Sequence, residues 1–120
     1  MLKVLFISNH AGFIKFNAPY MRYLRGNNIE VHNASPGVEI NSFYDRQINI
    51  PIQRNPLSLR NVKAYNILKK ICEMEKYDII HCHTPTGGII GRLLGRFLKK
   101  KNIRVKIIYT AHGFHFYKGA

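Results

Sequence analysis

Two histidines near the end of the sequence are placed where they could do chemistry. His112 and His115 belong to the stretch Thr110-Ala-His-Gly-Phe-His-Phe116, which follows an apolar run typical of a β-strand. A histidine just past such a strand and before a glycine is poorly suited to a hydrophobic core. A neutral imidazole there can donate a hydrogen bond to a sugar hydroxyl, or lie beside positive charge that develops at an anomeric carbon. We therefore predict a functional role for His112, whereas for His115 structural and functional roles both stay open.

A second pair of histidines, His81 and His83, brackets Cys82 at the end of another apolar run. Alternate residues of a strand face the same side, so the two imidazoles can converge while Cys82 points away. A metal site would need further ligands, and the evident candidates are His112 and His115. No carboxylate accompanies them, so we expect no metal. The alternative is a strand end whose imidazoles are held by hydrogen bonds.

A glycine-containing loop, Asn9-His-Ala-Gly-Phe13, follows the first apolar run. Gly12 would allow a tight turn in which backbone amides approach an anionic or sugar ligand at a helix start. The full G-x-G-x-x-G pattern is absent, which disfavours a dinucleotide site, and an ordinary turn glycine is the alternative. The six acidic residues are scattered, so neither a Ser/His/Asp set nor the carboxylate pair of hydrolytic glycosidases is evident.

These motifs need a scaffold of strands and helices to position them. Apolar strands that alternate with helices predict an α/β Rossmann-like fold, a three-layer sandwich in which a mostly parallel sheet carries helices on both faces. Ligands of such sheets bind at the carboxyl ends of the strands, where the histidine and glycine motifs fall. In chain order, the predicted strands are 3–8, 29–34, 47–52, 78–82 and 105–110, and helices begin near Pro19, after Ser58 and after Thr84.

Two of the predicted helices are clearly amphipathic. In the first, Ser58 is the expected cap, and the shared apolar face consists of Ala64, Leu68, Ile71 and Cys72. In the second, Gly87, Gly91 and Gly95 recur along one edge of an apolar arc, where they would let the backbone approach a neighbouring element closely. The arc consists of Ile89, Ile90, Leu93, Leu94, Phe97 and Leu98.

Charge is the unusual feature of the composition. Nineteen Lys and Arg against six Asp and Glu give a formal net charge of +13, which attracts polyanions. Basic residues of the second helix lie opposite its apolar arc, and they form either a solvated face or a surface that docks on an anionic membrane. No aromatic residue except Phe97 alternates with these charges, which disfavours a base-stacking site for single-stranded nucleic acid, and we expect no nucleic acid partner. The basic residues are Arg92, Arg96, Lys99 and Lys100.

The composition also limits the class of protein. A chain of 120 residues, 46% of them hydrophobic, suffices for one domain with its own core. It contains no run of about 18 apolar residues that could span a membrane, and its start lacks the features of a signal peptide. We therefore expect a cytoplasmic protein in which Cys72 and Cys82 are free and buried.

Several segments of the chain match one family in order and spacing. They are Ala11-Gly-Phe-Ile-Lys-Phe16, Pro51-Ile-Gln-Arg-Asn-Pro-Leu-Ser-Leu-Arg-Asn61, Tyr77-Asp-Ile-Ile-His-Cys-His-Thr-Pro-Thr-Gly-Gly88, Gly91-Arg92 and the closing stretch 109–120. Together they resemble the bacterial family 4 glycosyltransferases, and more narrowly the branch associated with capsular and exopolysaccharide synthesis. The closing stretch is the most specific of them.

The resemblance implies a retaining hexosyltransferase of the two-domain GT-B type, which moves a sugar from a nucleotide-sugar to an acceptor without a metal. It implies that residues 1–120 form one incomplete N-terminal, acceptor-side domain, and that the nucleotide-sugar domain is absent. Alone, such a chain would not catalyse transfer, and a homodimer could cover the open sheet edge. Acceptors in this branch are often lipid-linked, which would bring the domain to the inner face of the plasma membrane.

The resemblance also implies roles for individual residues. His112 would contact the transferred sugar as the catalytic group, and the loop at Gly12 and Phe13 would lie against the donor sugar and phosphate. The surface at Arg92, Arg96, Lys99 and Lys100 would face the membrane. On the acceptor side, the matching residues are Lys15, His83, Thr84, Phe114 and His115.

Two other functions stay open. The chain could be a stand-alone basic module that binds nucleic acid or an anionic membrane surface. It could also be a partner subunit that a separately encoded C-terminal half completes. High charge explains neither the stretch His112-Gly113-Phe114 nor the regular spacing of glycines, so the transferase domain is favoured.

Overall fold

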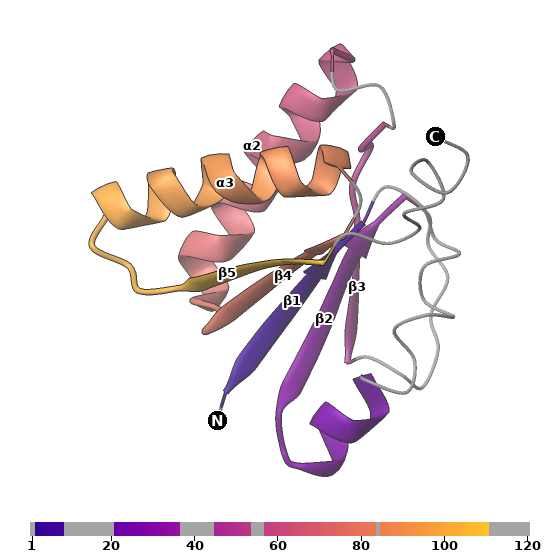
Figure 1. Ribbon diagram of the computed structural model, residues 1–120, viewed down its shortest axis with the longest axis vertical. Coiled ribbons are helices and arrows are strands. Elements are labelled where there is room, and N and C mark those ends of the chain that lie inside the picture. Colours follow the sequence, from indigo (N-terminus) through magenta and orange to yellow (C-terminus); the bar gives the residue numbers. More distant parts are fainter. Residues whose placement is uncertain (1, 9–20, 37–44, 54–56, 84, 111–120) are drawn as a thin grey trace, which may run out of the picture.

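The computed structural model describes residues 2–8, 21–36, 45–53, 57–83 and 85–110. Five parallel strands form one sheet in the order β3-β2-β1-β4-β5 (Figure 1). Its strands are β1 (Lys3–Ile7), β2 (Glu30–Ser35), β3 (Arg46–Asn49), β4 (Ile79–His83) and β5 (Lys106–Thr110), and its long helices are α2 (Leu59–Glu75) and α3 (Pro85–Lys100).

The central strand β1 shows why the fold has three layers. Its run of apolar residues is buried on both faces, because successive side chains of a strand point in opposite directions. Leu5 and Ile7 face the core beneath α2 and α3. Phe6 faces the other side, where Met21 and Leu24 of the helical residues 21–26 cover it. The predicted α/β Rossmann-like sandwich is therefore confirmed, with all five strands parallel.

Helix α2 begins where the sequence predicts. The Ser58 hydroxyl accepts a hydrogen bond from the Arg60 backbone N–H at 3.3 Å, which satisfies one amide that has no partner within the helix. Ala64, Leu68 and Cys72 are buried against the sheet, as the apolar pattern predicts. Burial raises the pKa of the Cys72 thiol to about 12, so this free cysteine stays protonated at neutral pH.

The glycines of α3 allow it to lie directly on the sheet. A Cβ atom added at Gly91 would overlap the sulfur of Cys82 in β4, and one at Gly95 would come within 3.1 Å of the Ile107 side chain in β5. The predicted close approach is therefore confirmed at both positions. Cys82 is free and buried, and burial raises its pKa to about 12.

The predicted apolar arc of α3 is only partly buried. Ile90, Leu94 and Leu98 face the core, whereas Ile89 is 48% exposed and Leu93 is 43% exposed. The apolar arc that the sequence predicts is therefore buried along one row and exposed at Ile89 and Leu93. Ile89 and Leu93 each precede a residue of the buried row by one position. They are therefore rotated by about 100° around the helix relative to that row.

None of the helices in the described part of the chain is both long and apolar enough to cross a membrane.

Candidate functional site

The strand order creates one topological switch point in the sheet. From β1 the chain proceeds to β2 and β3 on one side, and it returns to β4 and β5 on the other side. Ligands of such sheets bind outside the carboxyl ends of the strands where the order reverses. At this point β1 ends at Ile7, followed by buried Ser8, and β4 ends at His83. We call this region, together with the ends of β2 and β5, the carboxyl edge.

The two histidines of β4 converge at the carboxyl edge, as the sequence predicts. The ring centroids of His81 and His83 lie 4.3 Å apart, while Cys82 between them packs on the opposite face against Gly91. Phe6 of β1 completes the group, with its ring 5.8 Å from His83 in a stacked arrangement. His83 is 1% exposed, so its ring is a packed part of the domain.

Further polar side chains continue this face of the sheet across β2 and β3. The register pairs Phe6 with Asn33, and Asn33 with Gln47, so these residues and His81 form one row. The Asn33 amide donates to Gln47 Oε1 at 2.8 Å and to the Ser35 hydroxyl at 3.1 Å. Sequence reasoning did not single these residues out. The signal in the sequence that could have identified them is the occurrence of polar residues within the buried strand β2.

Most of the predicted contact residues lie outside the described part of the chain. This holds for the predicted catalytic His112 and for Gly12, Phe13, Lys15, Thr84, Phe114 and His115. The strand before the closing stretch is described, and its last residue, Thr110, pairs with His83 in the register of β4 and β5. The roles assigned to these seven residues therefore stay predictions.

The described acidic residues all lie away from the carboxyl edge. Each precedes a strand, begins a strand or belongs to the last turn of α2. The described part of the carboxyl edge therefore carries no carboxylate, and backbone and side-chain donors there meet no negative charge from the described residues. Such an edge suits a hydroxyl-rich or anionic ligand. The five acidic residues are Glu30, Asp45, Glu73, Glu75 and Asp78.

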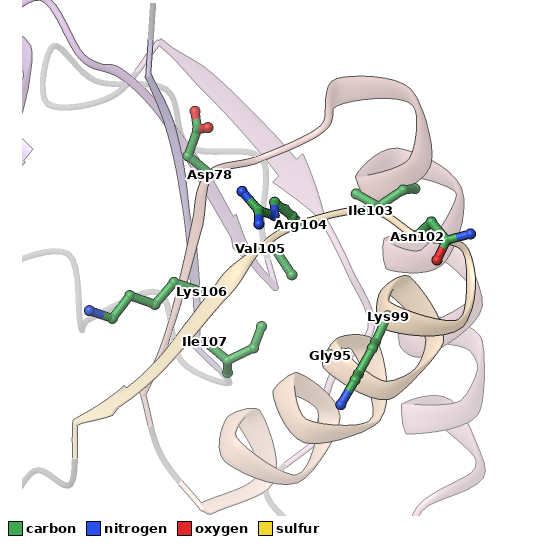
Figure 2. A pocket seen from close by; sticks show the side chains of 9 residues that line it. All are labelled: Asp78, Gly95, Lys99, Asn102, Ile103, Arg104, Val105, Lys106 and Ile107. Atoms are coloured by element: carbon green, nitrogen blue, oxygen red, sulfur yellow. The ribbon is translucent and has the colours of Figure 1, made fainter.

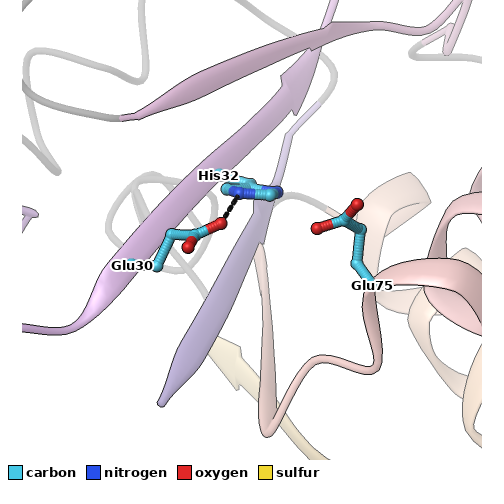
Figure 3. Close-up of side chains that lie close together, drawn as sticks. All are labelled: Glu30, His32 and Glu75. Carbon is cyan, nitrogen blue, oxygen red and sulfur yellow. Dashed lines mark hydrogen bonds and ion pairs between the residues drawn. The ribbon is translucent and has the colours of Figure 1, made fainter. Parts of the chain in front are cut away.

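A cluster of Glu30, His32 and Glu75 lies at the opposite, amino edge of the sheet (Figure 3). Ligand atoms from the three side chains lie within 4.8 Å of one another, as a metal site would require. Both Glu75 oxygens are already paired, with Lys3 at 3.0 Å and with Arg46 at 3.3 Å. These two cations balance the two carboxylates, so we interpret the cluster as a structural ion-pair network. The expectation that no metal is needed stays a prediction.

Tyr77 extends this network into the core. Its hydroxyl lies 2.6 Å from Nδ1 of His32, and Nε2 of His32 lies 2.5 Å from the Glu30 carboxylate. Burial raises the pKa of the Tyr77 hydroxyl, so the phenol keeps its proton. It can therefore donate to Nδ1, which leaves the Nε2 hydrogen for Glu30.

A hollow opens at the outer edge of the sheet, between the end of α3 and the start of β5 (Figure 2). It lies beside the amino end of β5, away from the histidine rings, so it is not the ligand crevice expected at the switch point. Its lining combines apolar side chains with three basic side chains and one acidic side chain. The lining residues are Asp78, Gly95, Lys99, Asn102, Ile103, Arg104, Val105, Lys106 and Ile107.

The chain matches the model of one protein family over nearly its whole length. The model of the family described as "Glycosyl transferase 4-like" matches residues 3–120, which is nearly the whole chain. The chain belongs to the glycosyl transferase 4-like family. The resemblance carried by the closing stretch and the earlier segments is thereby confirmed.

Individual relatives show how far the similarity extends. One relative is EpsD of Bacillus subtilis (strain 168), which is named provisionally as a glycosyltransferase. It is 42% identical to this chain over 108 residues, and the match covers 90% of this chain and 28% of EpsD. A UDP-Gal:alpha-D-GlcNAc-diphosphoundecaprenol alpha-1,3-galactosyltransferase of Escherichia coli is 35% identical over 63 residues, covering 52% of this chain and 15% of that enzyme. The chain thus spans less than a third of either relative.

Solved structures show the same fold at low sequence identity. Sucrose-phosphate synthase from Thermosynechococcus elongatus has a TM-score of 0.71 at 15% identity, covering 98% of this chain and 35% of the synthase. MurG of Acinetobacter baumannii has a TM-score of 0.59 at 16% identity, covering 98% of this chain and 38% of MurG. At such identities the likeness shows a shared fold.

Proposed function

We propose that this chain is the N-terminal, acceptor-side domain of a retaining GT-B glycosyltransferase. The completed enzyme would move a hexosyl group from a nucleotide-sugar to an acceptor in surface polysaccharide synthesis. The observation that carries the proposal is a carboxyl edge without a carboxylate from the described residues, at the switch point of a parallel sheet, in a chain of the glycosyl transferase 4-like family. A nucleotide-sugar domain would close over this edge to form the cleft.

Each part of the predicted site has a chemical task in this proposal. Backbone amides at Gly12 and Phe13 would bind the donor phosphates, whose departure leaves positive charge on the anomeric carbon. The neutral imidazole of His112 would hydrogen-bond the transferred sugar. The buried rings of His83 and Phe6 would form a rigid wall behind the acceptor, and Thr84 would contact the acceptor. None of these tasks requires a metal or another cofactor.

The acceptor is proposed to be lipid-linked, with the remaining predicted residues, Lys15, Phe114 and His115, on its side of the cleft. The name of the Escherichia coli relative states that it acts on a diphosphoundecaprenol-linked sugar. A further relative, 30% identical over 92 residues, is a 41.2 kDa protein of the cps region of Klebsiella pneumoniae. These names support a capsular or exopolysaccharide role.

A lipid-linked acceptor would place the protein at the inner face of the plasma membrane, as a cytoplasmic, peripheral protein. All four basic side chains predicted to face the membrane are exposed on α3, away from the sheet. Their charge would attract anionic lipids over a distance of about 8 Å at physiological ionic strength. They are Arg92, Arg96, Lys99 and Lys100.

The proposed function is tested by replacing His112 in an enzyme that also contains the nucleotide-sugar domain. We expect His112→Ala to lower sugar transfer by about 100-fold or more, since the contact forms with the transferred sugar. The melting temperature should change little, because a ligand contact adds nothing to the core. Transfer at the parental rate by the variant would contradict the assignment, and absence of transfer from any nucleotide-sugar by the parent would contradict the proposed function.

The open edge of the sheet is proposed as the site of homodimerisation when no further domain covers it. Among the described residues, β5 pairs only with β4, so its other side offers free backbone groups. The hollow beside it is lined in part by the apolar side chains described above. Analytical ultracentrifugation of the 120-residue chain should show a dimer, and a purely monomeric chain at high concentration would contradict this.

A further inference from the structure

Apolar side chains are exposed at the beginning of α2 and from the second turn to the middle of α3. Leu59 in the first turn of α2 is 85% exposed, and Val62, one turn later, is 55% exposed. Leu57, just before the helix, is exposed as well, as are Ile89 and Leu93 of α3. Single exposed apolar residues are common in soluble proteins, whereas a contiguous group indicates a binding surface.

Contacts between α2 and α3 bring these side chains onto one surface. The Tyr65 hydroxyl of α2 donates to the Leu93 carbonyl oxygen of α3 at 3.4 Å. Val62 lies about one turn before Tyr65, and Ile89 lies about one turn before Leu93, on the same sides of their helices. Exposed apolar residues therefore continue from the contact towards the two helix starts. We call Leu57, Leu59, Val62, Ile89 and Leu93 the apolar strip.

Along the two helix segments that carry the apolar strip, the charged residues have a single sign. Neither 57–72 nor 85–106 contains an acidic residue. Neither helix has an acidic residue in its first turn, so the positive end of each helix dipole is uncompensated. An apolar strip within a positive field matches an anionic bilayer, in which the apolar side chains reach the acyl chains and the cations meet the phosphates. The surrounding basic residues are Arg60, Lys63, Lys69, Lys70, Arg92 and Arg96.

The position of the apolar strip fixes an orientation. Helix α3 begins at Pro85, directly after the carboxyl end of β4. Helix α2 ends at Glu75, which pairs with Lys3 at the amino end of β1, so the start of α2 lies towards the carboxyl edge. Figure 1 shows the starts of both helices on the same side of the molecule. A membrane that receives the apolar strip would therefore lie next to the carboxyl edge.

We propose that the apolar strip inserts into an anionic lipid bilayer and holds the carboxyl edge at the membrane surface. This inference deepens the proposed function, on which it rests, by naming α2 as the anchoring element in addition to the basic face of α3. Charge attracts the domain to the bilayer, and the leucine and valine side chains fix which side faces the lipid.

The chain contains no tryptophan, so one introduced tryptophan reports its own surroundings. Leu59→Trp would place it on the apolar strip, and Met74→Trp is a matched control at a 73% exposed position near the other end of α2, roughly 22 Å away. With phosphatidylcholine vesicles that contain phosphatidylglycerol, we expect a blue shift and protection from acrylamide for Leu59→Trp alone. Equal behaviour of the two variants would overturn the inference.

Vesicle sedimentation tests the same surface without a reporter. The double substitution Leu59→Asn and Val62→Asn should weaken binding to the anionic vesicles by roughly tenfold or more, since two apolar side chains no longer enter the bilayer. Met74→Asn should bind like the parent, and circular dichroism should confirm that both variants fold. Unchanged binding by the double variant would show attraction by charge alone and overturn the inference. Tight binding to duplex DNA without binding to the vesicles would also overturn it.

Sugar transfer separates this inference from the proposed function. In the completed enzyme, the double variant should transfer normally to a water-soluble acceptor and poorly to a lipid-linked acceptor in anionic vesicles. Normal transfer to both acceptors would overturn the membrane inference and leave the proposed function intact. Loss of transfer to both would show that the strip serves catalysis or folding, and it would also overturn the inference.

Discussion

The two edges of the sheet are built from different interactions. At the amino edge, Glu75 pairs with Lys3 and Arg46, and His32 lies between Tyr77 and Glu30. At the carboxyl edge, aromatic rings of β1 and β4 stack, α3 lies on β4 through Gly91, and the Asn33 and Gln47 amides share a hydrogen bond. All described acidic residues belong to the amino side. Ion pairs thus lie at the amino edge of the sheet, and close packing of rings lies at its carboxyl edge.

This difference has a physical reason in the proposed function. A carboxylate at the carboxyl edge would repel the phosphates of a nucleotide-sugar, and a mobile ion pair would not keep a ligand wall rigid. At the amino edge, far from the expected ligand, ion pairs can tie the ends of strands and helices together at no cost to binding. Substitutions at the carboxyl edge should therefore act through packing, and those at the amino edge through hydrogen bonds and charge.

The largest effect is expected where α3 meets β4. Gly91→Leu should lower the free energy of unfolding by about 3 kcal/mol, because the space is filled by the Cys82 sulfur. Urea unfolding measures the loss, which should not depend on salt. Gly26→Leu is the matched control, since nothing lies within 4 Å of the position of its added Cβ. Combining Gly91→Ala with Cys82→Ala should restore part of the stability lost with Gly91→Ala alone. Equal losses at Gly91 and Gly26 would contradict the packing.

An intermediate effect is expected from the buried hydrogen bond of the amino edge. Tyr77→Phe should cost about 1–2 kcal/mol, because Nδ1 of His32 would lose its partner inside the core. Thermal unfolding measures this loss, and exposed Tyr23→Phe serves as the control with no expected change. A neutral result for Tyr77→Phe would show that the amino edge does not depend on this hydrogen bond.

The smallest effect is expected from the ion pairs of Glu75. The Lys3 ammonium lowers the pKa of the Glu75 carboxyl below its ordinary value of 4.5, so the pair stabilises the fold above this pH and the contribution is lost as the pH falls through the folded pKa. Glu75→Gln should therefore cost less than about 1 kcal/mol at neutral pH. The difference from the parent should shrink at high salt and vanish at acidic pH. A loss of stability that depends on neither salt nor pH would show that Glu75 acts through packing and not through its charge.

The same pair has a second limit at alkaline pH. The hydrogen bond to Glu75 raises the pKa of Lys3 above its ordinary value of 10.5. This contribution is therefore present below pH 10.5 and is lost as the pH rises through the folded pKa. Between the two limits both groups are charged, which is where the ion pair contributes.

Much of the fold follows from local patterns in the sequence. The buried runs at β1 and β4, the cap at Ser58 and the glycine spacing of α3 each have a local physical cause, and the structure confirms all of them. The convergence of His81 and His83 also follows from the period of a strand. The exposure of Ile89 and Leu93 does not follow from the sequence pattern. Periodicity assigns an apolar face to a helix, but it does not determine how much of that face the neighbouring elements cover.

The sequence by itself determined the elements, their alternation and the family, because these depend on neighbouring residues and on ordered motifs. Only the tertiary structure decided which residues meet across the sheet. It paired Phe6 with His81 and with Asn33, and it separated the five described acidic residues from the carboxyl edge. It also joined the starts of α2 and α3 into one exposed apolar strip. Such contacts depend on strand order, which brings together residues that are distant in the chain and that no local pattern relates.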